Sequence, residues 1–405
     1  MISLGKVYRV LADVYTKGSW IGEAIDRQGL SAEKGALRLI YGVVEREQLY
    51  EYRIGRLTDR APKTSVKVLL KMGMCLLDTF DLADHSAVNA IAETAKKVGK
   101  GAVGGFINAV LRRYATEGGE MYPTDPDELL AVRSDRPLWL VKRYISELGR
   151  ERAEKRLIAP MSAKTHIRPA FAFGQGNLLA VLVERAIPYE ETPFGCYIGE
   201  VGKVSDLIRD GRVTVMSRSS IEVAASLPYL GGEILDLAAA PGGKSVWLAE
   251  HYGADVIAAD RYEHRVALIG KYAARMHVST VRPTVWDGTI LREDWIERFS
   301  SVLLDAPCSG LGSIPSNPDV LIHRKEEDLT EIIRLQHILI LRAAEYVTTG
   351  GSLLYATCSD LPSENEAVVR ALLEERDNFT LEKEKYTDPT EGGGESYYYA
   401  LLRKK

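Results

Sequence analysis

The stretch 233–245, EILDLAAAPGGKS, decides the fold of this chain. It has the pattern of a short apolar strand that runs into a Pro-Gly-Gly turn and then opens a helix. Further short apolar runs follow, most of them separated by helical patterns, of which 327–347 is the clearest. These runs are DVIAAD (255–260), TVRPTVWD (280–287), SVLLDAP (301–307) and SLLYATC (352–358). Strands that alternate with helices predict a parallel, doubly wound α/β sheet, in which ligands bind at the carboxyl ends of the strands.

The glycine turn predicts a nucleotide-like ligand, because glycines let a ligand approach the backbone and a helix start offers free N–H groups. A phosphate-binding loop would need glycine at the position of Ala238, and a GxGxxG dinucleotide motif is absent. S-adenosylmethionine fits better, since carboxylates end the next two predicted strands. Asp260 is placed to hold ribose hydroxyls, and Asp287 is placed to receive an adenine amino group. Such turns are often purely structural, but the acids in register favour the cofactor.

Two cysteines, Cys308 and Cys358, follow the fourth and fifth predicted strands, which we expect to be neighbours. A free cysteine is usually a small buried hydrophobe, and Cys75 and Cys196, outside the sheet region, are interpreted that way. A reducing compartment disfavours a disulfide between the other two. Two thiols at one sheet edge suit methylation of a pyrimidine, where one adds to carbon 6 and a second function releases the product methylated at carbon 5. A nearby carboxyl group would stabilise the charge that develops on the base.

The composition indicates an ordinary soluble globular protein. The 405 residues are 46% hydrophobic and 27% charged, and this length corresponds to about two to four domains. We find no apolar run long enough for a membrane span and no secretory signal. Four cysteines are too few for a disulfide framework, and no CxxC pair indicates a zinc site. We therefore expect a cytoplasmic protein with no membrane segment and no metal.

The chain changes character along its length. Residues 1–115 have helical periodicity, the Gly-, Pro- and Asp-containing segment 118–127 is the best linker candidate, and 165–230 mixes β-like runs with a helix, as in a small α+β module. The net charge of −4 conceals an asymmetry, because residues 1–230 sum to +5, with +6 in 131–170 alone, and residues 231–405 sum to −9. The basic part is either a set of solvated helix faces or a surface that follows nucleic-acid phosphates.

Three motifs resemble the Fmu/Sun (RsmB-type) RNA cytosine-5 methyltransferases: DLAAAPGGKS (236–245), LLDAPCSGLG (303–312) and YATCSDLPSENEAVV (355–369). The stretch 69–115 resembles the NusB-type helical domain that RsmB-type members carry. The resemblance implies three domains. They are a NusB-like helical RNA-binding domain at 1–122, a basic linker helix with a small α+β RNA-positioning module at 123–212, and a Rossmann-like methyltransferase domain at 213–405.

Carried over by position, the resemblance implies roles for individual residues. S-adenosylmethionine would contact Ala238, Ala239, Ala240, Pro241, Gly242, Gly243, Lys244, Asp260, Asp287 and Asp305. Cys358 would be the covalent nucleophile, Cys308 would assist release of the methylated product, and Asp305 would also support the target base. Spacing alone leaves the two cysteines open, since DNA cytosine methyltransferases use a Pro-Cys cysteine as nucleophile, which here would be Cys308.

The reaction expected from this resemblance is the formation of 5-methylcytosine in RNA by a monomeric enzyme, with 16S ribosomal RNA as the expected substrate. The target base must be unpaired or flipped out, because carbon 6 cannot be reached inside a base stack. The rival hypotheses are a tRNA cytosine-5 methyltransferase and a catalytically inert RNA-binding scaffold.

Overall fold

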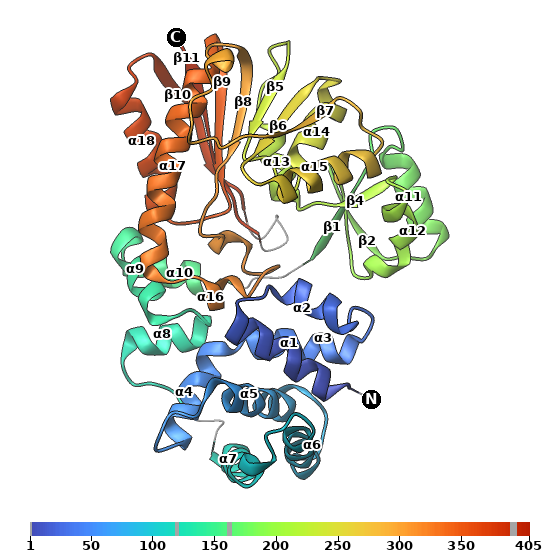
Figure 1. Cartoon of the computed structure of the whole chain (residues 1–405), viewed down its shortest axis with the longest axis vertical. Helices are drawn as coiled ribbons and strands as arrows, with labels where there is room; N and C mark the ends of the chain where they lie inside the picture. Colours follow the sequence, from blue (N-terminus) through green and yellow to red (C-terminus); the bar gives the residue numbers. More distant parts are fainter. Residues whose placement is uncertain (1, 118–120, 160–163, 389–394) are drawn as a thin grey trace. The chain divides into compact units, whose positions relative to one another are not determined.

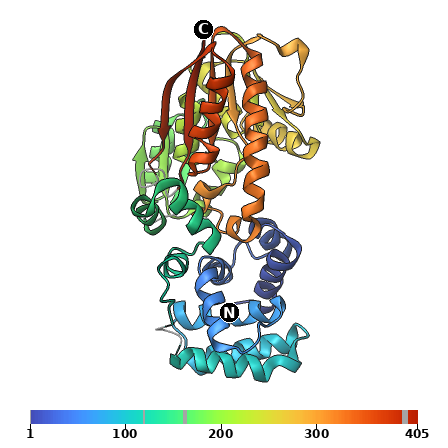
Figure 2. The same ribbon diagram turned by 90° about the vertical axis from the view of Figure 1, so that its left-hand side faces the viewer.

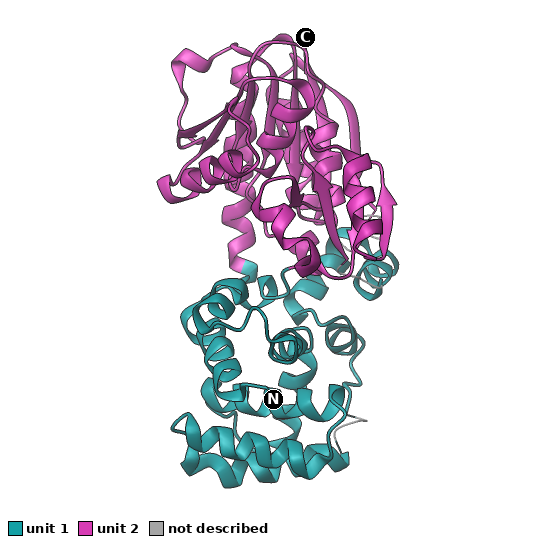
Figure 3. Cartoon of the chain, turned by 90° about the vertical axis from the view of Figure 1, so that its right-hand side faces the viewer, with its two compact units in different colours: residues 1–159, 317–326 teal, residues 160–316, 327–405 magenta. Residues whose placement is uncertain are grey.

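The computed structural model describes residues 2–117, 121–159, 164–388 and 395–405, so that residues 118–120 of the predicted linker lie outside it. The chain divides into two compact units, which Figure 3 colours separately. The first, here called the helical unit, comprises Met1–Ala159 and Asn317–Glu326. The second, here called the sheet unit, comprises Pro160–Ser316 and Glu327–Lys405. The finer division at residues 122 and 212 stays a prediction.

The helical unit confirms the periodicity of residues 1–115. Its central helix, α5 (Thr64–Thr79), is buried over most of its length and packs against α1, α3, α6 and α7. Gly73 of α5 lies so close to Leu111 of α7 that an added methyl group would overlap the leucine side chain, which explains the small residue. The other helices are α1 (Leu4–Lys17), α2 (Ile21–Gln28), α3 (Lys34–Val44), α4 (Glu47–Leu57), α6 (Asp84–Lys97), α7 (Gly104–Glu117), α8 (Pro126–Ser134), α9 (Leu138–Leu148) and α10 (Arg150–Ile158).

A short segment from far along the chain completes the helical unit. Ile322 of α16 (Val320–His323) packs against the apolar core of the N-terminal helices. The buried carboxylate of Asp319 accepts a hydrogen bond of 2.7 Å from the backbone N–H of Ile21, the first residue of α2. The rings of Trp20 and His323 meet edge to face at 4.7 Å. A side chain 298 residues further along the chain thus caps α2.

The sheet unit contains, among its described residues, a sheet of seven strands in the order β10-β11-β9-β8-β5-β6-β7. Strands β5 to β9 run parallel to their neighbours in this group, whereas β10 and β11 are antiparallel additions at one edge. The strands are β5 (Ile234–Leu237), β6 (Val256–Asp260), β7 (Val281–Val285), β8 (Phe299–Asp305), β9 (Val347–Thr357), β10 (Phe379–Tyr386) and β11 (Tyr398–Lys404). The predicted doubly wound α/β fold is confirmed.

Helices cover both faces of this sheet (Figure 1; Figure 2). One face is covered by α17 (Glu326–Tyr346) and α18 (Glu366–Glu375), and the other by α13 (Arg218–Ala225), α14 (Gly243–Tyr252) and α15 (Glu263–Arg275). In β5, Leu235 and Leu237 pack into the first layer, whereas Ile234 packs into the second. Successive side chains of a strand point to opposite faces, so a strand covered on both sides is apolar throughout.

A smaller antiparallel sheet, in the order β2-β3-β1-β4, confirms the predicted α+β module. Its elements are β1 (Thr165–Pro169), α11 (Gln175–Glu184), β2 (Tyr189–Thr192), β3 (Gly195–Ile198), α12 (Ser205–Arg209) and β4 (Val213–Val215). Arg168 of β1 forms a buried ion pair of 2.6 Å with Glu250 of α14. Arg136 is also buried. Two arginines of the basic segment 131–170 therefore lie in the interior, and fewer of its charges are exposed to contact nucleic-acid phosphates.

The strands β10 and β11 were not predicted. β10, FTLEKEKY, is exposed along almost its whole length and carries no apolar alternation that would reveal it. β11, YYALLRK, has the aromatic composition of a strand and could have been recognised.

Candidate active site

The carboxyl ends of the parallel strands meet at one edge of the sheet. β8 ends at Asp305, which pairs with Ala356 of β9, so the loops after these two strands begin side by side. β5 ends at Leu237, which pairs with Ala259 of β6. Residues predicted from different strand ends are therefore brought to a common edge, as parallel topology requires.

The turn after β5 has a backbone that few residues tolerate. Ala238 adopts a φ of 86°. Gly242 adopts a φ of 105°, and a Cβ at this position would lie 3.1 Å from the backbone of Ile269 in α15, which explains the glycine. The N–H groups of Ala238 and Ala239 both donate to Ala259 of β6, at 2.9 and 2.8 Å, and so fix the turn against that strand.

A pocket of about 610 Å³ opens beside this turn. Asp260 accepts a hydrogen bond from the N–H of Ala240 at 3.2 Å and lies 3.5 Å from the guanidinium of Arg265. Asp287 accepts hydrogen bonds from the N–H and the hydroxyl of Thr289, at 3.0 and 2.7 Å. Apolar walls come from Leu237, Trp286, Pro307, Leu335 and Leu339.

The pocket suits the adenosine part of S-adenosylmethionine. Its carboxylates can accept hydrogen bonds from ribose hydroxyls and an adenine amino group, and its aromatic and apolar walls can pack on a purine. Burial alone would raise the pKa of Asp287, but the hydrogen bonds from Thr289 and the charge of Arg261 lower it. Of the predicted cofactor residues, Ala238, Asp260 and Asp287 line this pocket, and Ala239, Ala240, Pro241, Gly242 and Gly243 form the adjoining turn and helix start.

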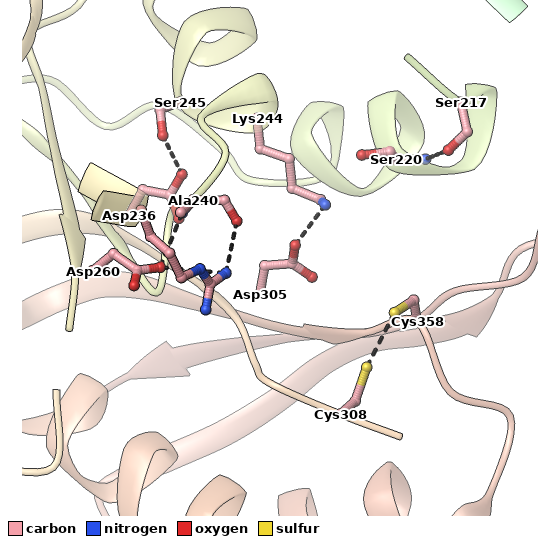
Figure 4. A network of polar contacts seen from close by, with 11 residues as sticks. Ser217, Ser220, Asp236, Ala240, Lys244, Ser245, Asp260, Asp305, Cys308 and Cys358 are labelled. Carbon is pink, nitrogen blue, oxygen red and sulfur yellow. Dashed lines mark hydrogen bonds and ion pairs between the residues drawn. The ribbon is translucent and has the colours of Figure 1, made fainter. Parts of the chain in front are cut away.

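The other two predicted cofactor residues, Lys244 and Asp305, pair with each other. Lys244 Nζ lies 2.6 Å from Asp305 Oδ2 and 4.8 Å from the centre of the Tyr397 ring. Burial would lower the pKa of Lys244, but the charge of Asp305 raises it above its ordinary value. Figure 4 shows this pair between the Asp236 and Asp260 side chains and the two cysteines.

Asp236 is a buried acid at the base of the turn. It is 1% exposed and accepts a hydrogen bond of 2.5 Å from the hydroxyl of Ser245, whereas its Oδ1 meets no donor in the described part of the chain. Burial raises its pKa to about 7, and the charges of Asp305 and Asp260 act in the same direction.

Cys308 and Cys358 face each other with their sulfur atoms 3.1 Å apart, and both are free thiols (Figure 4). The hydrogen bond with Cys358, then burial and the charges of Glu364 and Asp305, raise the pKa of Cys308 well above its ordinary value. Cys75 is buried in the helical unit, and Cys196 is buried in the small sheet, where burial raises its pKa to about 11.

Several residues of this region were missed from the sequence. Trp286, Tyr262 and Arg265 of the pocket wall follow or lie near the predicted acids, but aromatic and basic residues are common after strands and gave no distinct signal. Glu364 lies in the motif at 355–369, where its position after the cysteine gave no indication of its contacts. Over the described ranges, no cluster of three or more His, Cys, Asp and Glu side chains could hold a metal ion. None of the described helices has the length and apolar character that crossing a membrane would require.

Comparisons with known proteins identify the family. Residues 227–400 match the family described as 16S rRNA methyltransferase RsmB/F, and residues 6–116 match the NusB family. A ribosomal RNA small subunit methyltransferase B from Xylella fastidiosa (strain Temecula1) is 30% identical over 392 residues, which cover 90% of this chain and 88% of that protein. The chain belongs to the RsmB/F methyltransferase family. A probable ribosomal RNA small subunit methyltransferase B from Bacillus subtilis (strain 168) is 29% identical over 360 residues, covering 84% of this chain and 80% of that protein.

Solved structures share the fold of this RsmB/F methyltransferase. The crystal structure of the protein PH0851 matches over 99% of both chains, with a TM-score of 0.84 and 22% identity. The structure of NSun6 from Pyrococcus horikoshii with SFG covers 66% of this chain and 98% of its own, with a TM-score of 0.58 and 18% identity. These likenesses establish the fold. Membership of the family, together with the pocket beside the glycine turn, identifies S-adenosylmethionine as the cofactor.

Proposed function

We propose that this enzyme methylates carbon 5 of a cytosine in the RNA of the small ribosomal subunit, through a covalent adduct with Cys358. The observation that carries the proposal is the pair of thiols, 3.1 Å apart, after two neighbouring parallel strands. Asp305 ends one of these strands, and Pro307, next to Cys308, lines the cofactor pocket. Two thiols, a carboxylate and a methyl donor are the groups that this reaction needs.

The chemistry explains why two thiols are needed. A cytosine ring does not attack a methyl sulfonium unaided. Addition of the Cys358 thiolate to carbon 6 forms a carbon–sulfur bond and moves electron density to carbon 5. When bound, S-adenosylmethionine supplies the methyl group that carbon 5 accepts. Transfer of the carbon 5 proton to a base, for which the thiolate form of Cys308 is the proposed group, then breaks the carbon–sulfur bond, returns the Cys358 thiolate and restores the aromatic ring.

The thiol environment supports Cys358 as the nucleophile. The raised pKa of Cys308, caused first by its hydrogen bond with Cys358, keeps Cys308 a neutral thiol in the resting enzyme. Once the sulfur of Cys358 is bound to carbon 6, it no longer acts on Cys308 as a thiol partner, so the largest cause of the raised pKa of Cys308 is removed and this pKa falls. Cys308 can then give up its own proton to solvent and, as a thiolate, accept the carbon 5 proton during release of the product.

Asp305 is the carboxylate for the target base. Its Oδ2 is engaged by Lys244, which holds the side chain beside the thiols. A carboxylate that accepts a hydrogen bond from the N4 amino group of the cytosine would hold the base with carbon 6 beside the thiols during attack.

RNA from the small ribosomal subunit is proposed because the relatives described above are named as methyltransferases of that RNA. The NusB match to residues 6–116 supports RNA binding by the helical unit. The cofactor pocket argues against an inert scaffold, and a tRNA substrate remains the alternative that the experiment must separate.

Bisulfite sequencing of ribosomal RNA and tRNA from cells with and without the gene tests the substrate. The loss of one cytosine signal in small-subunit RNA is expected, and a loss in tRNA alone would contradict the proposal. For the mechanism, Cys308→Ala should accumulate a protein–RNA adduct that survives a denaturing gel, and Cys358→Ala should form none. An adduct trapped by Cys358→Ala would reverse the roles of the two cysteines.

A further inference from the structure

The carboxylate of Glu364 lies in a buried network that joins the loops of the two cysteines. Glu364 is 0% exposed and ends the short 3-10 turn η6 (Pro362–Glu364), six residues after Cys358. Its Oε2 accepts a hydrogen bond of 2.8 Å from the N–H of Ser309, and its Oε1 accepts one of 2.5 Å from the Ser309 hydroxyl. The same Oε1 also accepts a hydrogen bond from the hydroxyl of Ser359. One carboxylate therefore holds the residue that follows each cysteine.

A third element reaches the same carboxylate from the covering helix. Gln336 of α17 is 0% exposed, and its amide nitrogen lies 3.0 Å from Glu364 Oε2 and 3.0 Å from the carbonyl oxygen of Pro307. Pro307 and Ser309 flank Cys308 in the sequence. The backbone on both sides of Cys308 is thus tied, directly or through Gln336, to one acidic group.

The position of Glu364 is itself fixed. The hydroxyl of Tyr355, on β9, donates to the carbonyl oxygen of Glu364 at 2.7 Å. The side chain of the next residue, Asn365, donates to the carbonyl oxygen of Ser359 at 3.0 Å and accepts a hydrogen bond of 2.5 Å from Thr357. The network therefore connects β9, the Cys358 loop and the Cys308 loop.

The chemistry of the network requires an acceptor on both oxygens. Each of the groups described around the Glu364 carboxylate is a donor, and an ionised carboxylate can accept from all of them. An amide in its place would turn one NH₂ group toward donors and break at least one contact. Burying a carboxylate is costly unless it is fully hydrogen-bonded, so an acid at this position points to a task beyond filling the core.

We propose that Glu364 is a positioning residue that sets the separation of Cys308 and Cys358, through Ser309 on the release side and Ser359 on the attack side. This inference rests on the proposed two-cysteine reaction. Glu364 holds the two serines by hydrogen bonds, and its charge also acts on Cys308. The geometry predicts that each serine serves one half of the reaction, which a purely structural network would not do.

The test compares Ser309→Ala, Ser359→Ala and Glu364→Gln in the full-length enzyme. Small-subunit RNA and S-adenosylmethionine with a labelled methyl group serve as probes. Ser309→Ala should accumulate a protein–RNA adduct and release product about tenfold more slowly or worse, because the Cys308 loop is loosened. Ser359→Ala should form the adduct more slowly by a similar factor, with no accumulation. Glu364→Gln should slow both steps.

Controls separate positioning from folding. Glu374→Gln removes a similar charge from the exposed side of α18 and should leave both rates unchanged. Circular dichroism and cofactor binding establish that each variant is folded, and if Glu364→Gln does not fold, the milder serine variants decide. Two results would overturn the positioning role. Either both folded serine variants form the adduct and release the product as the wild type does, or each variant slows adduct formation and product release equally.

The same experiment distinguishes this inference from the proposed reaction. Cys358→Ala is measured in parallel. If Cys358→Ala still methylates RNA, the two-cysteine reaction is wrong. If Cys358→Ala is inactive while the serine variants behave as wild type, only the role of Glu364 is wrong.

Discussion

Replacing Asp236 by Asn should make the stability of the sheet unit less dependent on pH. Asp236 is buried, and burial raises its pKa from 3.8 to about 7. Folding therefore favours the protonated acid, and this contribution to stability is complete below the unfolded pKa and is lost as the pH rises through about 7. Asn has the same shape and stays neutral, so the variant should not lose stability in this way.

The size of the effect follows from the two pKa values. One pKa unit corresponds to about 1.4 kcal/mol, so the titration of Asp236 lowers the free energy of unfolding by roughly 4 kcal/mol at pH 8 and by about 2 kcal/mol at pH 5, relative to a group that stays neutral. The gap in free energy of unfolding between Asp236→Asn and the wild type should therefore widen by about 2 to 3 kcal/mol between these pH values. Comparing two pH values cancels any constant difference between an amide and a protonated acid.

The measurement is urea unfolding without cofactor, followed by tryptophan fluorescence. In a Trp20→Phe/Trp139→Phe background, the emission comes from Trp247, Trp286 and Trp295, which all lie in the sheet unit. Asp255→Asn, at an exposed acid just before β6, is the matched control and should show no widening. If the gap for Asp236→Asn is the same at pH 5 and pH 8, the reasoning is refuted.

Three further predictions concern other parts of the chain. Arg168→Met should destabilise the sheet unit by about 3 to 5 kcal/mol in urea unfolding, because Glu250 would be left buried without its partner, and Arg168→Met/Glu250→Leu should recover most of the loss. A loss below about 1 kcal/mol for Arg168→Met would contradict this. Asp319→Ala should destabilise the helical unit by about 1 to 2 kcal/mol, since Ile21 would lose its buried acceptor, and hydrogen exchange at α2 should rise; unchanged exchange would exclude the capping role. Arg133→Glu and Lys142→Glu, at exposed positions of the basic segment, should weaken RNA binding. The slope of log binding constant against log salt concentration should become less steep by at least about 0.7 per charge, and an unchanged slope would mean that this face is only solvated.

Much of the sheet unit could be predicted because each parallel strand carries its own signal. The five apolar runs became β5 to β9, and the helix expected at 327–347 became α17, since apolar period and length are local properties. β10 escaped because its pairing with β11, rather than an apolar face of its own, holds it in the sheet.

The site was predictable only as far as strand ends determine it. Asp260, Asp287, Cys308 and Cys358 end or follow strands, so topology alone brings them to one edge. The pairing of Lys244 with Asp305 and the contacts of Glu364 depend on which way side chains turn inside the core. No spacing along the chain records these directions, and a resemblance carries over residues rather than contacts.

The docking of residues 317–326 onto the N-terminal helices determines when the helical unit can be finished during synthesis. N-terminal domains generally fold first as the chain leaves the ribosome. Here the acceptor for Ile21 and the apolar contact of Ile322 arrive only after β8 and the Cys308 loop have been made. A chain cut short before residue 317 would lack both the second cysteine and the closing piece of its helical unit, so that truncated products are incomplete in both parts at once.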